Sequence, residues 1–236
     1  MSNKVVGDTE LQSDVLEDLR AAVNYRRWLC SLGMPYFGDN LLEIGSGMGY
    51  YASDWADMGV KLTASEADPA RLAGLYERFE NDPRVSVREL AVPIDETADY
   101  SAVVAYNVLE HIPDQIDALK AFSGLLRPGG AVVLVVPAFE FAMSKFDLEI
   151  GHQRRYTKAS MAEALTSAGL EIERCQYINA LGLFAWYGAV KLLNRRPQES
   201  PMLTLYDKVY IPVERRIESK IRPPFGQSVF AVARAR

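Results

Sequence analysis

Cysteine is scarce in this chain of 236 residues, which has only Cys30 and Cys175. Two thiols are too few for the disulfide framework of a small secreted domain or for a thiolate metal site. The first ten residues also lack the apolar core of a secretory signal peptide. These absences predict a cytoplasmic protein.

An excess of positive charge is missing as well, because 26 Lys and Arg stand against 31 Asp and Glu, a net charge of −5. Sequence-independent binding to nucleic acid needs a basic face, so we expect a small-molecule partner and no nucleic acid. The longest apolar stretch, roughly 180–193, contains Lys191 and is shorter than the about 20 residues that span a bilayer. We therefore expect no transmembrane helix.

Short apolar runs alternate with helical patterns along most of the chain, which is typical of βαβ units. Near-continuous apolar strands indicate a sheet that is buried on both faces. We predict a Rossmann-like, doubly wound α/β fold with seven strands, mostly parallel, and an antiparallel last strand that closes the sheet at its edge. The expected strands are 41–45, 60–65, 85–87, 100–106, 131–137, 172–179 and 226–235, and the expected helices between them are 50–58, 69–79, 114–126 and 157–169.

One domain is expected to cover residues 1–236. Apolar residues at helical spacing predict an N-terminal helix over 11–32. A lid-like helical insertion is predicted over about 180–222, where a polar stretch near 194–201 separates two helices. Pro128, Gly129 and Gly130 are expected to end the helix before them and turn the chain into a strand.

A glycine-rich turn follows the first predicted strand, with Gly45, Gly47 and Gly49 spaced as GxGxG. Glycines let the backbone approach a ligand closely, and Glu66, at the end of the second strand, can accept hydrogen bonds from ribose hydroxyls. A dinucleotide turn usually reads GxGxxG, and a carboxylate such as Glu43 beside two phosphates would be repelled. The pattern favours a cationic nucleoside over a nicotinamide cofactor.

At these residues the chain resembles the class I methyltransferases that use S-adenosylmethionine (SAM), in the style of their small-molecule, ubiquinone-biosynthesis-like branch. The likeness covers roughly residues 38–137. It is carried by LLEIGSGMG, LTASEADPARL, YSAVVAYNVLEHIPD and LLRPGGAVVLVVP, which begin at residues 41, 62, 100 and 125.

The resemblance implies that SAM is the cofactor and S-adenosylhomocysteine its product. Many relatives have an aspartate for the adenine amino group where this chain has Leu90 and Ala91, so adenine recognition is expected to use backbone. Asn107 stands where some relatives have a metal-binding glutamate, and no metal is expected. The implied cofactor residues are Tyr25, Glu43, Gly45, Ser46, Gly47, Gly49, Glu66, Ala67, Leu90, Ala91, Asn107 and Val108. For Tyr25 an ordinary role in helix packing is the alternative.

The acceptor site is expected at the carboxyl edge of the sheet, where open α/β sheets bind ligands. A hydroxyl acceptor must lose a proton, and His152 is the predicted catalytic base. His111, Arg154, Arg155 and Tyr156 are predicted to bind the acceptor. The alternatives are a purely structural His111 and a salt bridge from the two arginines to Asp147 or Glu149.

The predicted insertion combines apolar and basic residues. Residues 186–222 hold eight Lys and Arg against four Asp and Glu, opposite to the charge of the whole chain. Such a segment could cover an apolar acceptor, lie on an anionic membrane surface, or form a homodimer contact. The remaining alternative is a helix packed on the sheet beside a solvated basic neighbour.

The resulting hypothesis is a SAM-dependent methyltransferase that methylates an oxygen or nitrogen of a small-molecule acceptor, with natural products, sugars and lipid-like molecules as the candidate classes. An NAD(P)-dependent oxidoreductase and a non-catalytic SAM-binding protein are the alternatives.

Overall fold

A computed structural model of the chain describes residues 11–13, 19–193 and 201–236. It contains a seven-stranded sheet with the order β3-β2-β1-β4-β5-β7-β6. All neighbouring strands are parallel except β7, which pairs antiparallel with both β5 and β6. This confirms the predicted fold class. The strands are β1 (Leu41–Ile44), β2 (Leu62–Glu66), β3 (Val85–Glu89), β4 (Tyr100–Tyr106), β5 (Leu126–Pro137), β6 (Glu171–Ile178) and β7 (Ser228–Arg234).

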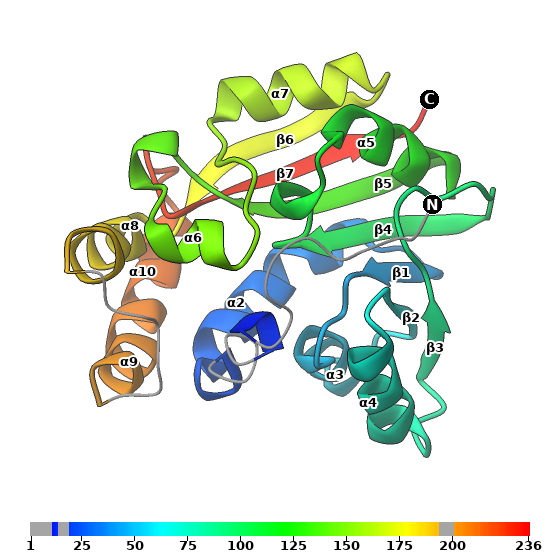
Figure 1. Cartoon of the computed structure of the whole chain (residues 1–236), viewed down its shortest axis with the longest axis horizontal. Coiled ribbons are helices and arrows are strands. Elements are labelled where there is room, and N and C mark those ends of the chain that lie inside the picture. Colours follow the sequence, from blue (N-terminus) through cyan, green and yellow to red (C-terminus); the bar gives the residue numbers. More distant parts are fainter. Residues whose placement is uncertain (1–10, 14–18, 194–200) are drawn as a thin grey trace.

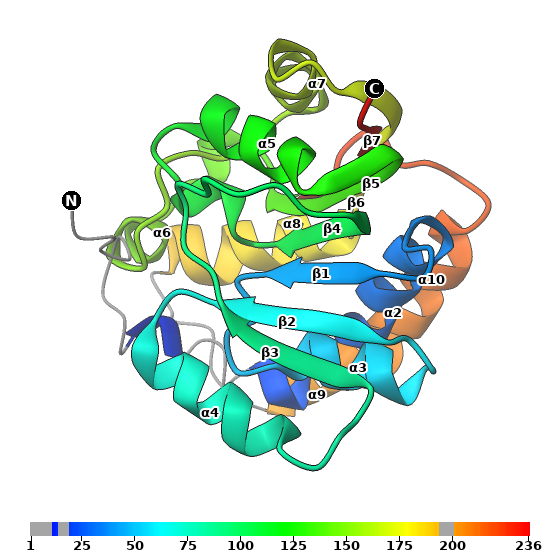
Figure 2. The same ribbon diagram turned by 90° about the vertical axis from the view of Figure 1, so that its right-hand side faces the viewer.

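Helices cover both faces of this sheet (Figure 2). One face packs α5 (Gln115–Gly124) and α7 (Lys158–Ser167), and the other packs α2 (Val23–Gly33), α3 (Tyr50–Asp57) and α4 (Pro69–Phe79). Successive residues of a strand point to opposite faces, so Val103 enters the first core and Val104 the second. The near-continuous apolar strands are thus explained by two cores.

The start of the helices follows from local chemistry. Asp68 caps α4, because its side chain accepts hydrogen bonds from the backbone N–H groups of Ala70 and Arg71, and Pro69 occupies the first helical position. Thr157 caps α7, because its side chain accepts a hydrogen bond from the backbone N–H of Ser160. The expected helix over 11–32 is found as a helical piece at 11–13, the 3-10 turn η1 (Leu19–Ala21) and α2. Residues 14–18 of that prediction lie outside the described residues.

Several short elements follow strands at the carboxyl edge of the sheet, where Figure 1 shows α6 (Lys145–Glu149). The 3-10 turn η3 (Leu109–His111) follows β4, and η4 (Glu140–Ala142) follows β5. The 3-10 turn η2 (Met34–Tyr36) precedes β1 and so lies at the opposite edge. The predicted insertion contains α8 (Ala180–Trp186) with the π-helical turn η5 (Tyr187–Leu192), and α9 (Pro201–Leu205) with the π-helical turn η6 (Tyr206–Tyr210) and α10 (Ile211–Glu218).

Two expectations about the strands are wrong. The last strand, β7, lies between β5 and β6 rather than at the edge, and six of its seven residues are buried. Pro128, Gly129 and Gly130 do not separate α5 from a strand, because α5 ends at Gly124 and these residues lie within β5. The pairing with β4 shifts register between Tyr100 and Ala102, and this irregularity accommodates the three residues.

Candidate active site

The glycine turn connects β1 to α3 at the carboxyl edge of the sheet. Gly45, Gly47 and Gly49 have φ angles of 68°, 56° and 76°, which residues with a Cβ rarely adopt. A Cβ at Gly45 would lie 2.7 Å from a methyl group of Val108, and one at Gly49 would lie 2.8 Å from side chains of α4. Gly49 therefore serves helix packing, and a ligand contact there stays a prediction.

Glu66 is the last residue of β2, the strand beside β1, and its side chain reaches the glycine turn. Its Oε2 accepts a 2.9 Å hydrogen bond from the backbone N–H of Gly47, and its Oε1 accepts from the backbone N–H groups of Ala67 and Asp68. The guanidinium of Arg71 lies 3.3 Å from the same carboxylate. Glu66 is thus a buried, preorganised carboxylate, and Oε2 keeps acceptor capacity for a sugar hydroxyl.

Glu43 is buried directly below the turn and accepts a 2.7 Å hydrogen bond from the hydroxyl of Ser46. Burial raises its pKa to about 8, with the nearby charge of Glu66 acting in the same direction against the Ser46 hydrogen bond. Without a cation beside it, Glu43 is mostly protonated at pH 7. The expectation of a fixed negative charge at this position therefore holds only when a cation is bound.

We expect SAM binding to release close to one proton at pH 7, because the amino group of its methionine portion would ionise Glu43. For a pKa of about 8 the release is roughly 0.9 proton per SAM bound. Titration calorimetry in buffers of different ionisation enthalpy measures this number. Glu43→Gln should abolish the release, and an unchanged release in that variant would contradict the prediction.

Glu43 also affects the stability of the chain alone. Its pKa is higher in the folded chain than in the unfolded chain, so its stabilising contribution is complete below about pH 4.5 and is lost as the pH rises through about 8. Thermal unfolding between pH 5 and 8 should therefore depend less on pH in Glu43→Gln than in the wild type.

The other predicted cofactor residues border the turn and Glu66. Leu90 donates its backbone N–H to the carbonyl oxygen of Glu66, and Ala91 follows it. Asn107, at the end of β4, is exposed and has a φ angle of 54°, a left-handed conformation that asparagine adopts more readily than most other non-glycine residues. Val108 packs on Gly45. Residues far apart in the sequence are thus brought together at one edge.

Tyr25 of α2 contacts other parts of the protein. Its hydroxyl shares hydrogen bonds with Ser228 and Asn179 at the junction of β7, β6 and α8, and burial raises its pKa. Its ring meets Trp28 edge-on with centroids 6.3 Å apart. These contacts agree with the helix-packing alternative for Tyr25, and a contact with the cofactor stays a prediction.

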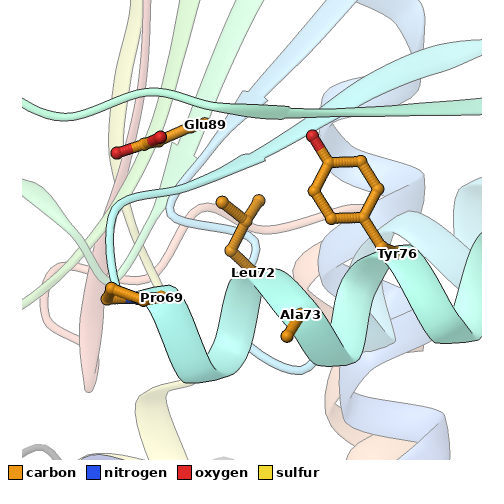
Figure 3. A pocket seen from close by; sticks show the side chains of 5 residues that line it. All are labelled: Pro69, Leu72, Ala73, Tyr76 and Glu89. Atoms are coloured by element: carbon orange, nitrogen blue, oxygen red, sulfur yellow. The ribbon is translucent and has the colours of Figure 1, made fainter.

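A groove of about 240 Å³ lies between α4 and β3 (Figure 3). Four residues of α4, Pro69, Leu72, Ala73 and Tyr76, line it together with Glu89. None of the residues predicted to bind the cofactor lines this groove. We place the candidate active site at the glycine turn and the polar cluster beside it instead.

That polar cluster contains both histidines of the chain. The rings of His111 and His152 meet edge-on with centroids 4.6 Å apart, and Nε2 of His152 lies 3.9 Å from a carboxylate oxygen of Glu110. Glu110 is fully buried, and neither carboxylate oxygen has a hydrogen-bond partner. Such unpaired buried oxygens are costly, and a polar ligand would satisfy them.

Burial sets the protonation of this cluster. It raises the pKa of Glu110 to about 7, although the charges of His152 and Arg155 oppose the shift. It also lowers the pKa of His111 to about 3, and the charges of His152 and Arg71 act in the same direction. His111 is therefore neutral, and Glu110 is close to its titration point at neutral pH.

Asp147 of α6 holds His152 in place. Its Oδ1 lies 2.8 Å from Nδ1 of His152, and its carbonyl accepts a hydrogen bond from the His152 backbone N–H. Asp147 also accepts hydrogen bonds from Ser144 and Arg155. Despite burial, these partners hold the pKa of Asp147 well below its usual range. Asp147 is therefore a buried carboxylate with fixed partners.

Three residues predicted to bind the acceptor differ in their hydrogen-bond and ion-pair partners. Arg155 pairs with Asp147 at 2.7 Å and stacks on Trp186, so the salt-bridge alternative is the one that the structure shows. Arg154 donates to the backbone carbonyls of Ile112 and Pro113 instead of Asp147 or Glu149. The hydroxyl of Tyr156 is buried without a partner, so an acceptor role for Tyr156 stays a prediction.

Glu110 and Asp147 are not among the site residues predicted from the sequence. Ser144 and Asp147 form a capping box at the start of α6, and this spacing indicates helix capping rather than catalysis. Only the fold of the chain shows that Asp147 also reaches His152.

Glu110, His111 and His152 each place one potential ligand atom within 4.8 Å of the others, a set that could hold a metal ion. The expectation of no metal therefore stays a prediction. Activity measured in the presence of a chelator would test it.

Val108 connects the two parts of the site. It packs on Gly45, and its carbonyl accepts the backbone N–H of His111. The glycine turn, the carboxylate of Glu66 and the histidine cluster thus border one region.

Comparison with known proteins identifies the family of the chain. The methyltransferase domain family matches residues 15–174. The chain belongs to this family. With the fold, this confirms the resemblance to class I SAM-dependent methyltransferases, and SAM is the cofactor of an enzyme of this kind.

Two curated relatives support the assignment. A probable SAM-dependent methyltransferase of Mycolicibacterium smegmatis is 32% identical over 66% of this chain and 59% of its own length. A ubiquinone biosynthesis O-methyltransferase of Xanthomonas oryzae is 31% identical over 58% of this chain and 64% of its own. The chain thus spans about three fifths of the length of these relatives.

Solved structures share the fold at low identity. The geranyl diphosphate C-methyltransferase of Streptomyces coelicolor, in complex with Mg²⁺, geranyl diphosphate and S-adenosylhomocysteine, has a TM-score of 0.60 and 15% identity. The likeness covers 88% of this chain and 76% of that one. A chain of a complex between the Haloferax volcanii Trm112 methyltransferase activator and a methyltransferase has a TM-score of 0.63 and 15% identity, covering 98% and 99%.

Proposed function

We propose that this methyltransferase transfers the methyl group of SAM to an oxygen or nitrogen of a small-molecule acceptor that binds at Glu110, His111 and His152. The observation that carries the proposal is the buried, unpaired carboxylate of Glu110 beside His152 at the carboxyl edge of the sheet. SAM supplies an electrophilic methyl group on a sulfonium. The protein has to align the acceptor with that methyl and exclude water.

The glycine turn and Glu66 are the parts of the site that would hold the cofactor. Gly47 presents backbone without a side chain, and three backbone N–H groups, including its own, position Glu66. The ionisable Glu43 suits the ammonium group. A cationic nucleoside therefore fits the charges of these residues.

His152 is the proposed general base. Because the carboxylate of Asp147 lies 2.8 Å from Nδ1, it favours the tautomer with the proton on that nitrogen. Nε2 then has a lone pair that can take the proton of an acceptor hydroxyl as its oxygen bonds to the methyl carbon. The carbon–sulfur bond breaks with its electron pair on sulfur, leaving neutral S-adenosylhomocysteine.

A screen of acceptors with methyl-labelled SAM tests the proposal. Phenols, sugars, lipid-like alcohols and amines form the panel, and label should enter at least one oxygen or nitrogen acceptor. SAM binding without transfer to any member or to a cell extract would favour a non-catalytic SAM-binding protein. Hydride transfer from a nicotinamide cofactor would overturn the proposal altogether.

Asp147→Asn is expected to lower kcat by about tenfold or more, measured with the acceptor that the screen identifies. The imidazole of His152 then loses the carboxylate that holds its tautomer and its orientation. The variant also leaves Arg155 unpaired, and a loss of about 3–5 kcal/mol in stability accompanies it.

Arg155→Met provides the control for that stability loss, because it removes the other partner of Asp147 without touching the imidazole. It should therefore keep a kcat much closer to that of the wild type than Asp147→Asn does. If both variants lower kcat equally, Asp147 acts only through stability.

A further inference from the structure

We propose that α8, α9 and α10 form a surface that binds the face of an anionic lipid bilayer. This inference does not depend on which acceptor is methylated. Figure 1 shows the three helices together at one end of the molecule, beyond the ends of β6 and β7. Within the described residues, none of the helices is long and apolar enough to span a membrane.

An exposed apolar stripe runs along α9, η6 and α10. Leu205, Val209, Val213, Ile217 and Ile221 are each at least half exposed, and each is four residues from the next. Residues four apart are neighbours on a helix surface, so these side chains form one continuous row. Soluble proteins rarely expose an apolar row of this length without a partner.

The first part of the insertion extends the apolar surface. Its exposed large apolar residues include Leu181 and Phe184 in α8, Leu192 in η5 and Leu193 just after it. Tyr187 contacts the exposed Phe141 edge-on, with ring centroids 5.9 Å apart. The apolar surface therefore continues towards η4, close to the candidate acceptor site.

The acidic residues of α9 to α10 all point inward. Asp207 accepts hydrogen bonds from the backbone of Asn24 and Tyr25 on α2. Glu214 accepts from the backbone of Leu181, and Glu218 accepts from that of Asn179 and Ala180. These contacts fix the helices to the body of the protein and remove three negative charges from their outer surface.

The basic residues of the same segment all point outward. Over residues 201–222 the five cations are exposed, whereas two of the three acids are buried and Glu218 is half buried. Arg216 and Lys220 each follow a member of the apolar row, Val213 and Ile217, by three residues, which makes them its neighbours on the helix. The cations are Lys208, Arg215, Arg216, Lys220 and Arg222.

This combination favours an anionic bilayer over a second copy of the chain. Large aliphatic side chains beside long basic ones are typical of helices that lie in the membrane interface, where the aliphatic groups enter the acyl region and the cations meet the headgroups. A symmetric dimer through the same surface would place these cations against their own copies. Charge complementarity therefore identifies an anionic lipid bilayer as the partner that this surface binds.

Vesicle co-sedimentation of the full chain tests the proposal. The protein should bind vesicles with about 30% phosphatidylglycerol in phosphatidylcholine and bind pure phosphatidylcholine much more weakly. Raising the salt concentration from about 50 mM to about 500 mM should weaken the binding. Val213→Ser with Ile217→Ser should raise the lipid concentration for half binding at least about tenfold. Arg216→Glu with Lys220→Glu should do so too.

Two variants elsewhere serve as controls. Tyr76 on α4 is 52% exposed, the same as Ile217, and Tyr76→Ser should bind vesicles as the wild type does. Lys61→Glu is the charge control, since Lys61 is exposed in front of β2. SAM affinity without vesicles should be normal in all variants, and this separates the proposal from the proposed catalytic function.

Unchanged vesicle binding by the apolar double variant would overturn the proposal. A second contradicting result would be a wild type that does not bind the anionic vesicles and that forms a dimer in solution. The double variant Val213→Ser with Ile217→Ser would then dissociate this dimer. That second result would assign the surface to another copy of the chain.

Discussion

Gly47→Val should abolish SAM binding in titration calorimetry, with a fall in affinity of at least about a hundredfold. Gly47 has a φ angle of 56°, which a β-branched residue adopts only with strain. Its backbone N–H also donates to Glu66, so the substitution disturbs the carboxylate expected to hold the ribose. Valine would in addition place two methyl groups where the ligand approaches the backbone.

Gly59→Val separates these local effects from general strain. Gly59 also has a positive φ angle, of 88°, and a Cβ there would meet nothing within 4 Å. It precedes β2, at the opposite edge of the sheet from Glu66. It should therefore carry a similar backbone strain and bind SAM normally. Normal SAM binding by Gly47→Val, or an equal loss in Gly59→Val, would remove the glycine turn from the cofactor site.

His152→Ala should lower turnover by about 10²-fold to 10⁴-fold while SAM affinity stays within about twofold of the wild type. The expectation follows from the position of the imidazole between Asp147 and Glu110 rather than at the glycine turn. Single-turnover measurements with the acceptor found by the screen, together with calorimetry for SAM, would show this division.

Added imidazole offers a further readout, because it can restore a missing base but not a missing scaffold. Partial rescue of His152→Ala by imidazole is expected, whereas His152→Gln, which fills the same space, should not be rescued. If His152→Ala lost SAM affinity as severely as Gly47→Val, the separation of cofactor and acceptor residues would be refuted.

Local patterns were enough to predict the strands and most of the helices between them. Each apolar run is short and bounded by turn residues, and the caps at Asp68 and Thr157 act through neighbours two or three positions away. The glycine turn and Glu66 were also predictable from the sequence, because parallel strands bring their carboxyl ends to one edge of a sheet. The 2.9 Å hydrogen bond between them agrees with that rule.

The place of β7 in the sheet could not be derived in this way. Its alternating pattern favoured an edge strand, yet it pairs on both sides, with β5 and with β6. The partners of a strand depend on how the whole chain returns to the sheet, and no short window of sequence records that. For the same reason no local pattern indicates that Tyr25 packs against Ser228, some 200 residues later.

By itself the sequence determined the fold class, the methyltransferase family and the glycine turn, since these depend on residues close together or on the regular geometry of parallel strands. Only the tertiary structure decided that Asp147 holds His152, that Arg155 is occupied by the same carboxylate, and that the acids of the helical insertion point inward. Those facts depend on the direction of side chains from elements far apart in the chain, which is fixed only when the elements pack together.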